Sequence, residues 1–149
     1  MLKKLISFIL IFNFMVASAQ LNQEPKKITN KFFSELNDLE NITPALKKKK
    51  GFTNYKELLN YIDEKVQNYP ELVSSNFIGE SQKGKKIPIL YVSKNNDYDN
   101  KKLRVWMQGG LHGNEPASTE SLLYLIHLIL ENPAYKYLLD KIDLAILPM

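Results

Sequence analysis

The chain has 149 residues, and its hydrophobic share of 44% is typical of a globular domain and too high for a disordered chain. Its formal net charge of only +4 gives no case for nucleic acid as a partner. The sequence contains no cysteine, which excludes disulfides, thiolate metal sites and lipid-bearing cysteines.

Residues 1–19 are predicted to be a secretory signal peptide that is cleaved before Gln20. A positively charged start precedes a mostly apolar run over residues 5–16, and small residues follow at 17–19. The alternative is an uncleaved membrane anchor, but a spanning helix needs about 20 apolar residues. We therefore expect an exported protein, periplasmic or extracellular, with no membrane contact after cleavage. An exported chain without disulfides fits a bacterial envelope protein or a secreted enzyme.

Residues 20–50 are predicted to be a leader or linker segment ahead of the domain. One short amphipathic helix fits there, and Thr43-Pro44 and the lysine run at 47–50 interrupt it. Such a run is typical of a solvated linker, and a specific anionic partner is the less favoured alternative. The apolar positions of this helix are Phe32, Phe33, Leu36 and Leu39.

The first helix of the domain is predicted after residue 53. Apolar residues recur there at helical spacing, and we expect the stripe that they form to pack in the core. Thr53 is expected to cap the amino terminus of this helix, and Pro70 to end it. The stripe consists of Tyr55, Leu58, Leu59, Ile62, Val66 and Tyr69.

Three strand-like runs follow, over residues 72–78, 86–93 and 102–108. The glycines between the first two runs predict that they form a hairpin. Pro88 lies inside the second run and cannot donate a backbone hydrogen bond to a neighbouring strand. It therefore predicts that this run lies at an edge of the sheet.

A buried helix is predicted from Pro116 to Glu131, because Pro116 suits the first helical position and most sides of the segment are apolar. A short helical turn over residues 134–140 and a buried strand over 142–147 are expected next. The order strand, helix, strand predicts a right-handed crossover between parallel strands. With the hairpin, this gives an α/β fold with a mixed sheet flanked by helices. We expect the last strand to form an exposed apolar edge that promotes aggregation.

The stretch Gly-Gly-Leu-His-Gly-Asn-Glu-Pro at residues 109–116 joins the third strand to the buried helix. In such sheets, ligands bind in the turns that follow the carboxyl ends of the strands. His112 and Glu115 lie three residues apart in this turn, and its glycines allow a tight backbone. Imidazole nitrogen and carboxylate oxygen both bind zinc. His112 and Glu115 are therefore candidate metal ligands.

A catalytic zinc site usually has three protein ligands and one open position. His127 is the only other histidine in the sequence. It lies eleven residues after Pro116, or ~16 Å along the helix, too far to reach the same ion. We expect it to have a structural partner, and we expect Glu120 in the first turn to be structural as well. The third ligand must be a residue not visible as a motif, a water molecule, or a residue outside this sequence.

Residues 106–116 resemble the first zinc-ligand motif of the carboxypeptidase A-like zinc metallopeptidases. The resemblance covers about residues 52–149, most of the chain after the signal peptide. It implies a zinc carboxypeptidase/phosphorylase-like α/β/α fold, of which residues 51–149 form the amino-terminal part of a truncated catalytic domain. Further segments are similar to the family's opening helix, to its hairpin and to the strand before its next active-site loop. They are residues 55–59, 69–73, 78–81, 84–88 and 146–149.

The resemblance implies that His112 and Glu115 are the first two ligands of one zinc ion. The family's third ligand, its general-base glutamate and its residues that bind the substrate carboxylate come later in its sequence. No catalytic residue and no further cofactor-binding residue is therefore expected within this chain. The implied function is an exported zinc-dependent metallocarboxypeptidase, a hydrolase that releases C-terminal residues from a peptide or protein substrate. The 149 residues alone are expected to be inactive.

Asn114 departs from the family pattern, because many members carry an arginine just before the ligand glutamate. The sequence His-Gly-Asn-Glu also resembles related amidohydrolases that remove an acyl group from an amino acid. A zinc-dependent deacylase of N-acyl amino acids and a cell-wall peptide hydrolase therefore remain alternatives. A third alternative is a truncated domain that binds a partner without catalysis.

Overall fold

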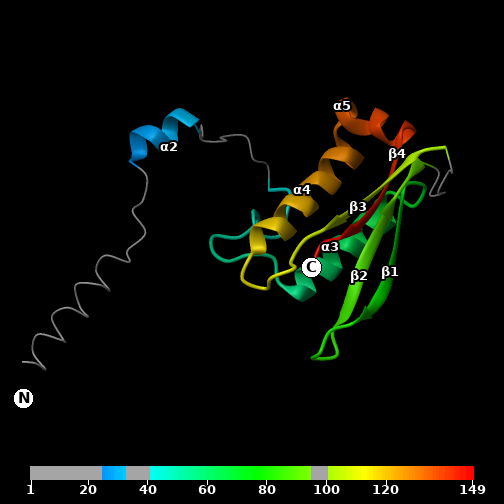
Figure 1. The fold of residues 1–149 in the computed structure, drawn as a ribbon, viewed down its shortest axis with the longest axis horizontal. Helices are drawn as coiled ribbons and strands as arrows, with labels where there is room; N and C mark the ends of the chain where they lie inside the picture. The colour runs from blue at the N-terminus through cyan, green and yellow to red at the C-terminus, as the bar shows by residue number, and fades with distance from the viewer. Residues whose placement is uncertain (1–24, 33–40, 95–100) are drawn as a thin grey trace, which may run out of the picture. The chain divides into compact units, whose positions relative to one another are not determined.

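The structure is a computed structural model, and it describes residues 25–32, 41–94 and 101–149 (Figure 1). The signal peptide predicted at 1–19 lies outside the described residues, as does most of the helix predicted in the leader. The chain divides into two units, Met1–Asp38 and Leu39–Met149. In the first unit, α2 (Lys26–Phe32) is a short helix of seven residues.

The second unit is built on a four-stranded mixed sheet with the strand order β1-β2-β4-β3. β1 (Val73–Glu80) and β2 (Lys86–Val92) form an antiparallel hairpin. β4 (Ile142–Leu147) pairs antiparallel with β2 and parallel with β3 (Leu103–Gln108). These pairings confirm the predicted hairpin, the predicted parallel pair and the mixed sheet.

The expectation that Pro88 marks an edge strand is wrong, because β2 lies between β1 and β4. The register gives the physical reason. β4 pairs with β2 only at residues 90–92, whereas Pro88 lies opposite Phe77 of β1. The proline therefore occupies a section of β2 that has a partner on one side only, where its missing N–H costs no ladder hydrogen bond.

The expectation of an exposed edge at residues 142–147 is also wrong. β4 has a partner on each side, and four of its six residues are buried. Within the described sheet, the edges are β1 and β3. Sequence order did not indicate this because the crossover places the last strand inside the sheet, next to the hairpin.

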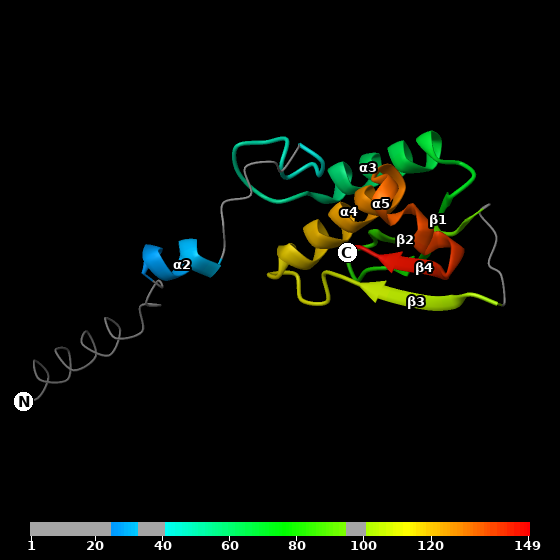
Figure 2. The ribbon, with the colours of Figure 1, turned by 90° about the horizontal axis from the view of Figure 1, so that it is seen from above.

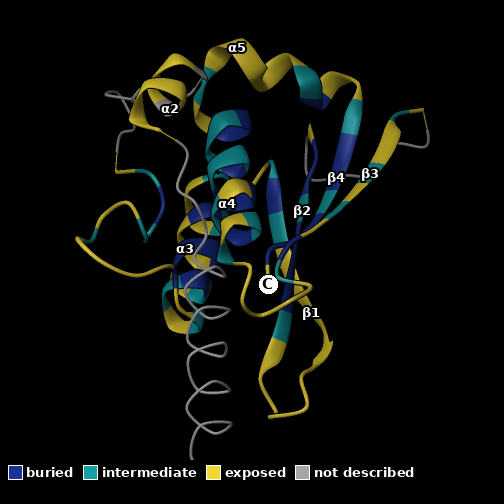
Figure 3. Ribbon diagram, turned by 60° about the vertical axis from the view of Figure 1, so that its left-hand side comes forward, coloured by how far each residue is buried: buried dark blue, intermediate teal, exposed yellow. Residues whose placement is uncertain are grey.

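Two long helices cover one face of the sheet, α3 (Tyr55–Asn68) and α4 (Pro116–Glu131) (Figure 2). α4 has the predicted bounds and begins with a proline. Its buried side faces the strands (Figure 3). α5 (Pro133–Lys136) and the 3-10 helix η2 (Tyr137–Asp140) follow, where a helical turn was predicted. The core that joins both helices to the sheet includes Leu58, Ile62, Leu90, Leu123, Ile126, Leu130, Leu144 and Ile146.

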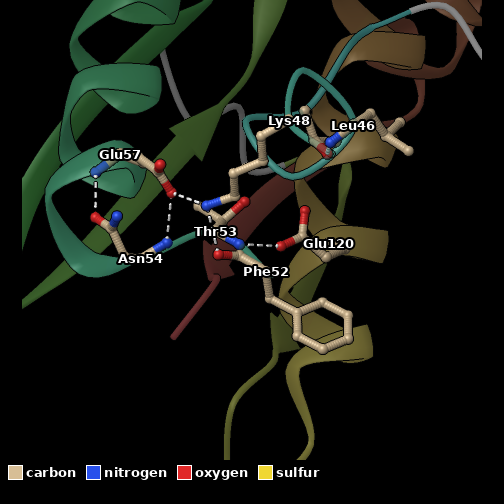
Figure 4. A network of polar contacts seen from close by, with 8 residues as sticks. Leu46, Lys48, Phe52, Thr53, Asn54, Glu57 and Glu120 are labelled. Atoms are coloured by element: carbon tan, nitrogen blue, oxygen red, sulfur yellow. Dashed lines mark hydrogen bonds and ion pairs between the residues drawn. The ribbon is translucent and has the colours of Figure 1, made fainter. Parts of the chain in front are cut away.

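Asn54 caps α3, so the prediction of Thr53 is wrong by one residue. The side chain of Asn54 accepts a hydrogen bond from the Glu57 amide at 3.0 Å, and the Glu57 carboxylate accepts one from the Asn54 amide at 2.8 Å (Figure 4). Thr53 instead donates its backbone N–H to Oε1 of Glu120 at 2.7 Å. This bond ties the segment before α3 to α4, and it confirms a structural role for Glu120.

Candidate metal site

The loop that joins β3 to α4, residues 109–115, begins against the end of β4. The amide of Gly109 donates to the Leu147 carbonyl oxygen at 2.8 Å. A Cβ atom on Gly109 would lie only 3.0 Å from the carbonyl oxygen of Pro148. Gly110 adopts a φ of +61°, which favours glycine. These two glycines let the chain turn away from the sheet in close contact with the end of β4.

His112 and Glu115 face each other at the tip of this loop. Nδ1 of His112 lies 3.1 Å from Oε2 of Glu115, and the two side chains are 66% and 61% exposed. The Glu115 amide donates to the His112 carbonyl oxygen at 3.0 Å, which closes the turn. The backbone of Glu115, with φ −113° and ψ 67°, is not helical, as expected for a residue before proline. The fold therefore brings together the two side chains that the sequence singled out.

The donor chemistry and the separation of this pair fit a zinc ion. Nitrogen and oxygen ligands at about 2.0–2.2 Å from a tetrahedral zinc lie roughly 3.3–3.6 Å from each other. The observed separation of 3.1 Å needs only a small rotation of either side chain to reach that value. In the described part of the chain, neither side chain has another hydrogen-bond partner, so none competes with a metal for it.

No third ligand joins this pair among the residues that the structure describes, where no group of three histidine, aspartate or glutamate residues is arranged to hold a metal. His127, near the other end of α4, has its Nδ1 3.2 Å from Oε2 of Glu131. This contact confirms the structural partner expected for His127. Oε1 of Glu131 in turn accepts a hydrogen bond from Nζ of Lys65 at 2.5 Å.

The surroundings of Glu131 act on its ionisation in opposite directions. Burial raises the pKa of its carboxyl group, but the hydrogen bond and charge of Lys65 and the contact with His127 outweigh burial. The pKa of Glu131 therefore lies below its ordinary value. Lys65 also lies over the ring of Tyr61, 5.0 Å from its centroid. Burial raises the pKa of Tyr61, whose hydroxyl donates to the Leu123 carbonyl oxygen at 2.7 Å.

Two hydroxyl residues in the first turn of α4 contact the ends of the loop and of β4, and sequence reasoning did not single them out. Oγ of Ser118 accepts a hydrogen bond from the Gly110 amide at 2.9 Å and donates one to the Glu115 carbonyl oxygen at 3.0 Å. The buried hydroxyl of Thr119 donates to the Pro148 carbonyl oxygen at 2.7 Å. The available signal was their position, because serine and threonine at a helix start often bond to nearby backbone.

Comparisons with known proteins place these observations in a family. A family model described as zinc carboxypeptidase matches residues 58–149. Carboxypeptidase 2 of Trichophyton rubrum is 40% identical over 74 residues, which are 46% of this chain and 14% of that protein. Carboxypeptidase B of Helicoverpa zea is 30% identical over 121 residues, 77% of this chain and 28% of that protein.

The fold has a counterpart among solved structures. The crystal structure of carboxypeptidase A from Helicoverpa armigera matches with a TM-score of 0.65 and 27% identity, covering 83% of this chain and 30% of that one. The mixed sheet flanked by helices is thus a fold that this chain shares with a carboxypeptidase. The chain spans less than a third of the length of these three proteins.

Proposed function

The chain belongs to the zinc carboxypeptidase family, and we propose that the protein is a metallocarboxypeptidase that binds one zinc ion through His112 and Glu115. The reaction is the hydrolysis of a peptide bond that releases the C-terminal residue of a peptide or protein substrate. The observation that carries the assignment is the exposed pair at 3.1 Å, at the carboxyl end of a parallel strand.

The described residues would support this chemistry by holding the metal and leaving it accessible. When bound, zinc polarises the scissile carbonyl and lowers the pKa of its bound water. His112 and Glu115 supply one nitrogen and one oxygen ligand from a loop whose ends are fixed to β4 and α4. Both side chains are more than half exposed in this chain, so none of its described elements covers the pair.

We propose that the third ligand and the general base come from outside these 149 residues, since the described residues bring no third ligand to the pair. Residues 1–149 alone are then expected to hydrolyse no peptide. Zinc-dependent release of an amino acid by the purified chain 20–149 would overturn this part of the proposal.

The proposal includes export and the division of the chain. Residues 1–19 would act as the cleaved signal peptide, residues 20–50 as a linker, and residues 51–149 as catalytic-domain sequence in the periplasm or outside the cell. Among the described residues, no helix combines the length and the apolar character that crossing a membrane requires. Amino-terminal sequencing of protein recovered from the envelope or medium tests this. An amino terminus at Gln20 is expected, and Met1 on recovered protein would contradict it.

Zinc binding and peptidase activity of the full-length protein test the site. We expect His112→Ala to lose about 100-fold or more in zinc affinity and to lose activity, because it removes a direct ligand. The matched control is His127→Ala, which removes the other histidine of these 149 residues, near the end of α4, and should leave zinc affinity unchanged. Equal zinc binding by the His112→Ala variant and the unsubstituted protein would refute the site.

The substrate class is tested with three compounds of similar size: a peptide with a free C-terminus, the same peptide with an amidated C-terminus, and an N-acyl amino acid. A carboxypeptidase cleaves the first compound much faster than the second. The sequence His-Gly-Asn-Glu, with Asn114 where many carboxypeptidases carry an arginine, supports deacylation as the second candidate function. Preferential cleavage of the N-acyl amino acid would support deacylation and reject the carboxypeptidase.

A further inference from the structure

The side chain of Ser118 bridges the two ends of the loop that carries His112 and Glu115. Its oxygen accepts from the amide of Gly110, two residues before His112, at 2.9 Å. Its hydroxyl hydrogen is directed to the carbonyl oxygen of Glu115 at 3.0 Å. One hydroxyl group thus joins the point where the loop leaves β3 to the point where it enters α4, and both candidate ligands lie on the segment between.

Between the ends of this bridge, the loop has one further backbone hydrogen bond, from the Glu115 amide to the His112 carbonyl oxygen at 3.0 Å. Gly110 has no side chain and occupies the left-handed region, so the chain can turn easily at this point. Gly113 has open space on the side where a Cβ atom would lie. His112 and Glu115 themselves are mostly exposed and receive no packing support from the core. The two hydrogen bonds of Ser118 are therefore the side-chain contacts that join one end of the loop to the other.

The environment of the bridge makes its loss costly. The contact between the Gly110 amide and the Ser118 oxygen is partly buried. A backbone amide in such a place needs a partner, because water does not fully replace the missing acceptor. Removing the hydroxyl would thus release Gly110 to find another acceptor, and the loop would change its shape between the two ligands.

We propose that Ser118 is a positioning residue for the metal: its hydroxyl sets the distance between the two ends of the loop and thereby pre-organises His112 and Glu115 for one ion. This inference rests on the proposed function, since it assumes that the pair binds zinc. Ser118 itself supplies no ligand, because its oxygen is already used by the backbone on both sides. Removing groups that orient metal ligands typically weakens metal binding about 10–100-fold.

Ser121 provides a matched control on the same helix. Its hydroxyl donates to the carbonyl oxygen of Ala117, one turn earlier, at 2.8 Å, and it is exposed. Ser121→Ala removes the same chemical group from the same helix without touching the loop. Ser118→Thr is the conservative variant, since threonine keeps the hydroxyl that forms the bridge.

The test measures the zinc affinity of the full-length protein by competition with a chromogenic chelator, and zinc is the only metal ion added. We expect Ser118→Ala to bind zinc about tenfold more weakly. Ser121→Ala and Ser118→Thr should bind as tightly as the unsubstituted protein. Hydrogen exchange of the metal-free protein gives a second measurement: the Gly110 amide should exchange about five- to tenfold faster in Ser118→Ala alone.

The outcomes separate this inference from the proposed function. If the unsubstituted protein binds no zinc, the proposed metal site fails and this inference fails with it. If the unsubstituted protein binds zinc and Ser118→Ala binds it equally well, only the positioning role fails. If Ser118→Ala and Ser118→Thr both weaken binding to the same extent, the hydroxyl is not the group responsible, and the inference is likewise overturned.

Discussion

In the loop before α4 His112 faces Glu115, and near the end of α4 His127 faces Glu131, with Nδ1 to carboxylate distances of 3.1 and 3.2 Å. The first pair lies in a glycine-rich loop and is 66% and 61% exposed. The second pair spans one turn of regular helix and is 17% and 30% exposed. The second pair also has a cationic partner, because the buried ammonium group of Lys65 lies 2.5 Å from Glu131.

The right residue types at the right distance do not by themselves make a metal site. At the second pair, a zinc ion would have to displace Lys65 from Glu131 and leave a buried positive charge without its main partner, which costs several kcal/mol. At the first pair, no neighbouring cation among the described residues has to be displaced. Availability of the carboxylate therefore separates a candidate functional pair from a structural one.

The largest expected effect is on zinc affinity, and it should be confined to the first pair. Glu115→Ala removes a ligand and is expected to weaken zinc binding about 100-fold or more. Glu131→Ala, its counterpart at the other end of α4, should leave affinity unchanged. Isothermal titration of the full-length protein with zinc distinguishes the two. A loss of affinity in Glu131→Ala as large as in Glu115→Ala would remove the distinction between the two ends of the helix.

When stability is measured without metal, Glu131→Ala should lower the free energy of unfolding more than Glu115→Ala does. Glu131→Ala leaves Lys65, which is 4% exposed, without its closest partner, while Glu64 remains at 3.5 Å. Loss of one partner of a fully buried pair costs about 3–5 kcal/mol. Because Glu131 is 30% exposed and Glu64 stays nearby, we expect about 2 kcal/mol here.

Glu115→Ala should change the free energy of unfolding by less than about 0.5 kcal/mol, as for an ordinary surface position. Urea unfolding of both metal-free variants checks this pair of values. A destabilisation of the Glu115→Ala variant by 2 kcal/mol would show that the first pair is structural, and would weaken the case for a metal there.

The sequence predicted the elements of the fold well where the signal was local. The helix α4 follows from Pro116 and the apolar run after it, and the hairpin follows from two strand-like runs joined by glycines. The wrong predictions concern features that depend on contacts between segments far apart in the sequence. The position of Pro88 depended on how far β4 extends along β2, and the helix cap depended on Thr53 bonding to Glu120, 67 residues away.

The candidate site shows the same division. His112 and Glu115 were identified from their spacing, the glycines and the family resemblance. That they face each other in an exposed loop needed the structure. The role of Ser118 was not evident, because a serine in the first turn of a helix is common. The pairing of Lys65 with Glu131 joins residues 66 positions apart, and no local pattern indicates it.

The smallest expected effect is the pH dependence of the second pair. Burial raises the pKa of Glu131, but the hydrogen bond and charge of Lys65 and the contact with His127 outweigh burial and hold that pKa below its ordinary value of 4.5. A lowered pKa in the folded state means that the carboxylate adds stability above pH 4.5, and that this contribution is lost as the pH falls through the lowered value. The stability difference between the unsubstituted protein and Glu131→Gln should therefore be largest near pH 6–7 and shrink below 4.5.

Glu131→Gln should cost less than Glu131→Ala at every pH, because the amide oxygen of glutamine still accepts a hydrogen bond from Lys65. Urea unfolding from pH 7 to pH 3 measures the difference, and the same substitution in a Lys65→Met background is the control. There the main partner that lowers the pKa is gone, so the difference should depend much less on pH. If the stability difference depended on pH just as steeply in the Lys65→Met background, a group other than Lys65 would cause the effect. Lys65 would then no longer distinguish the pair of His127 and Glu131 from the pair of His112 and Glu115.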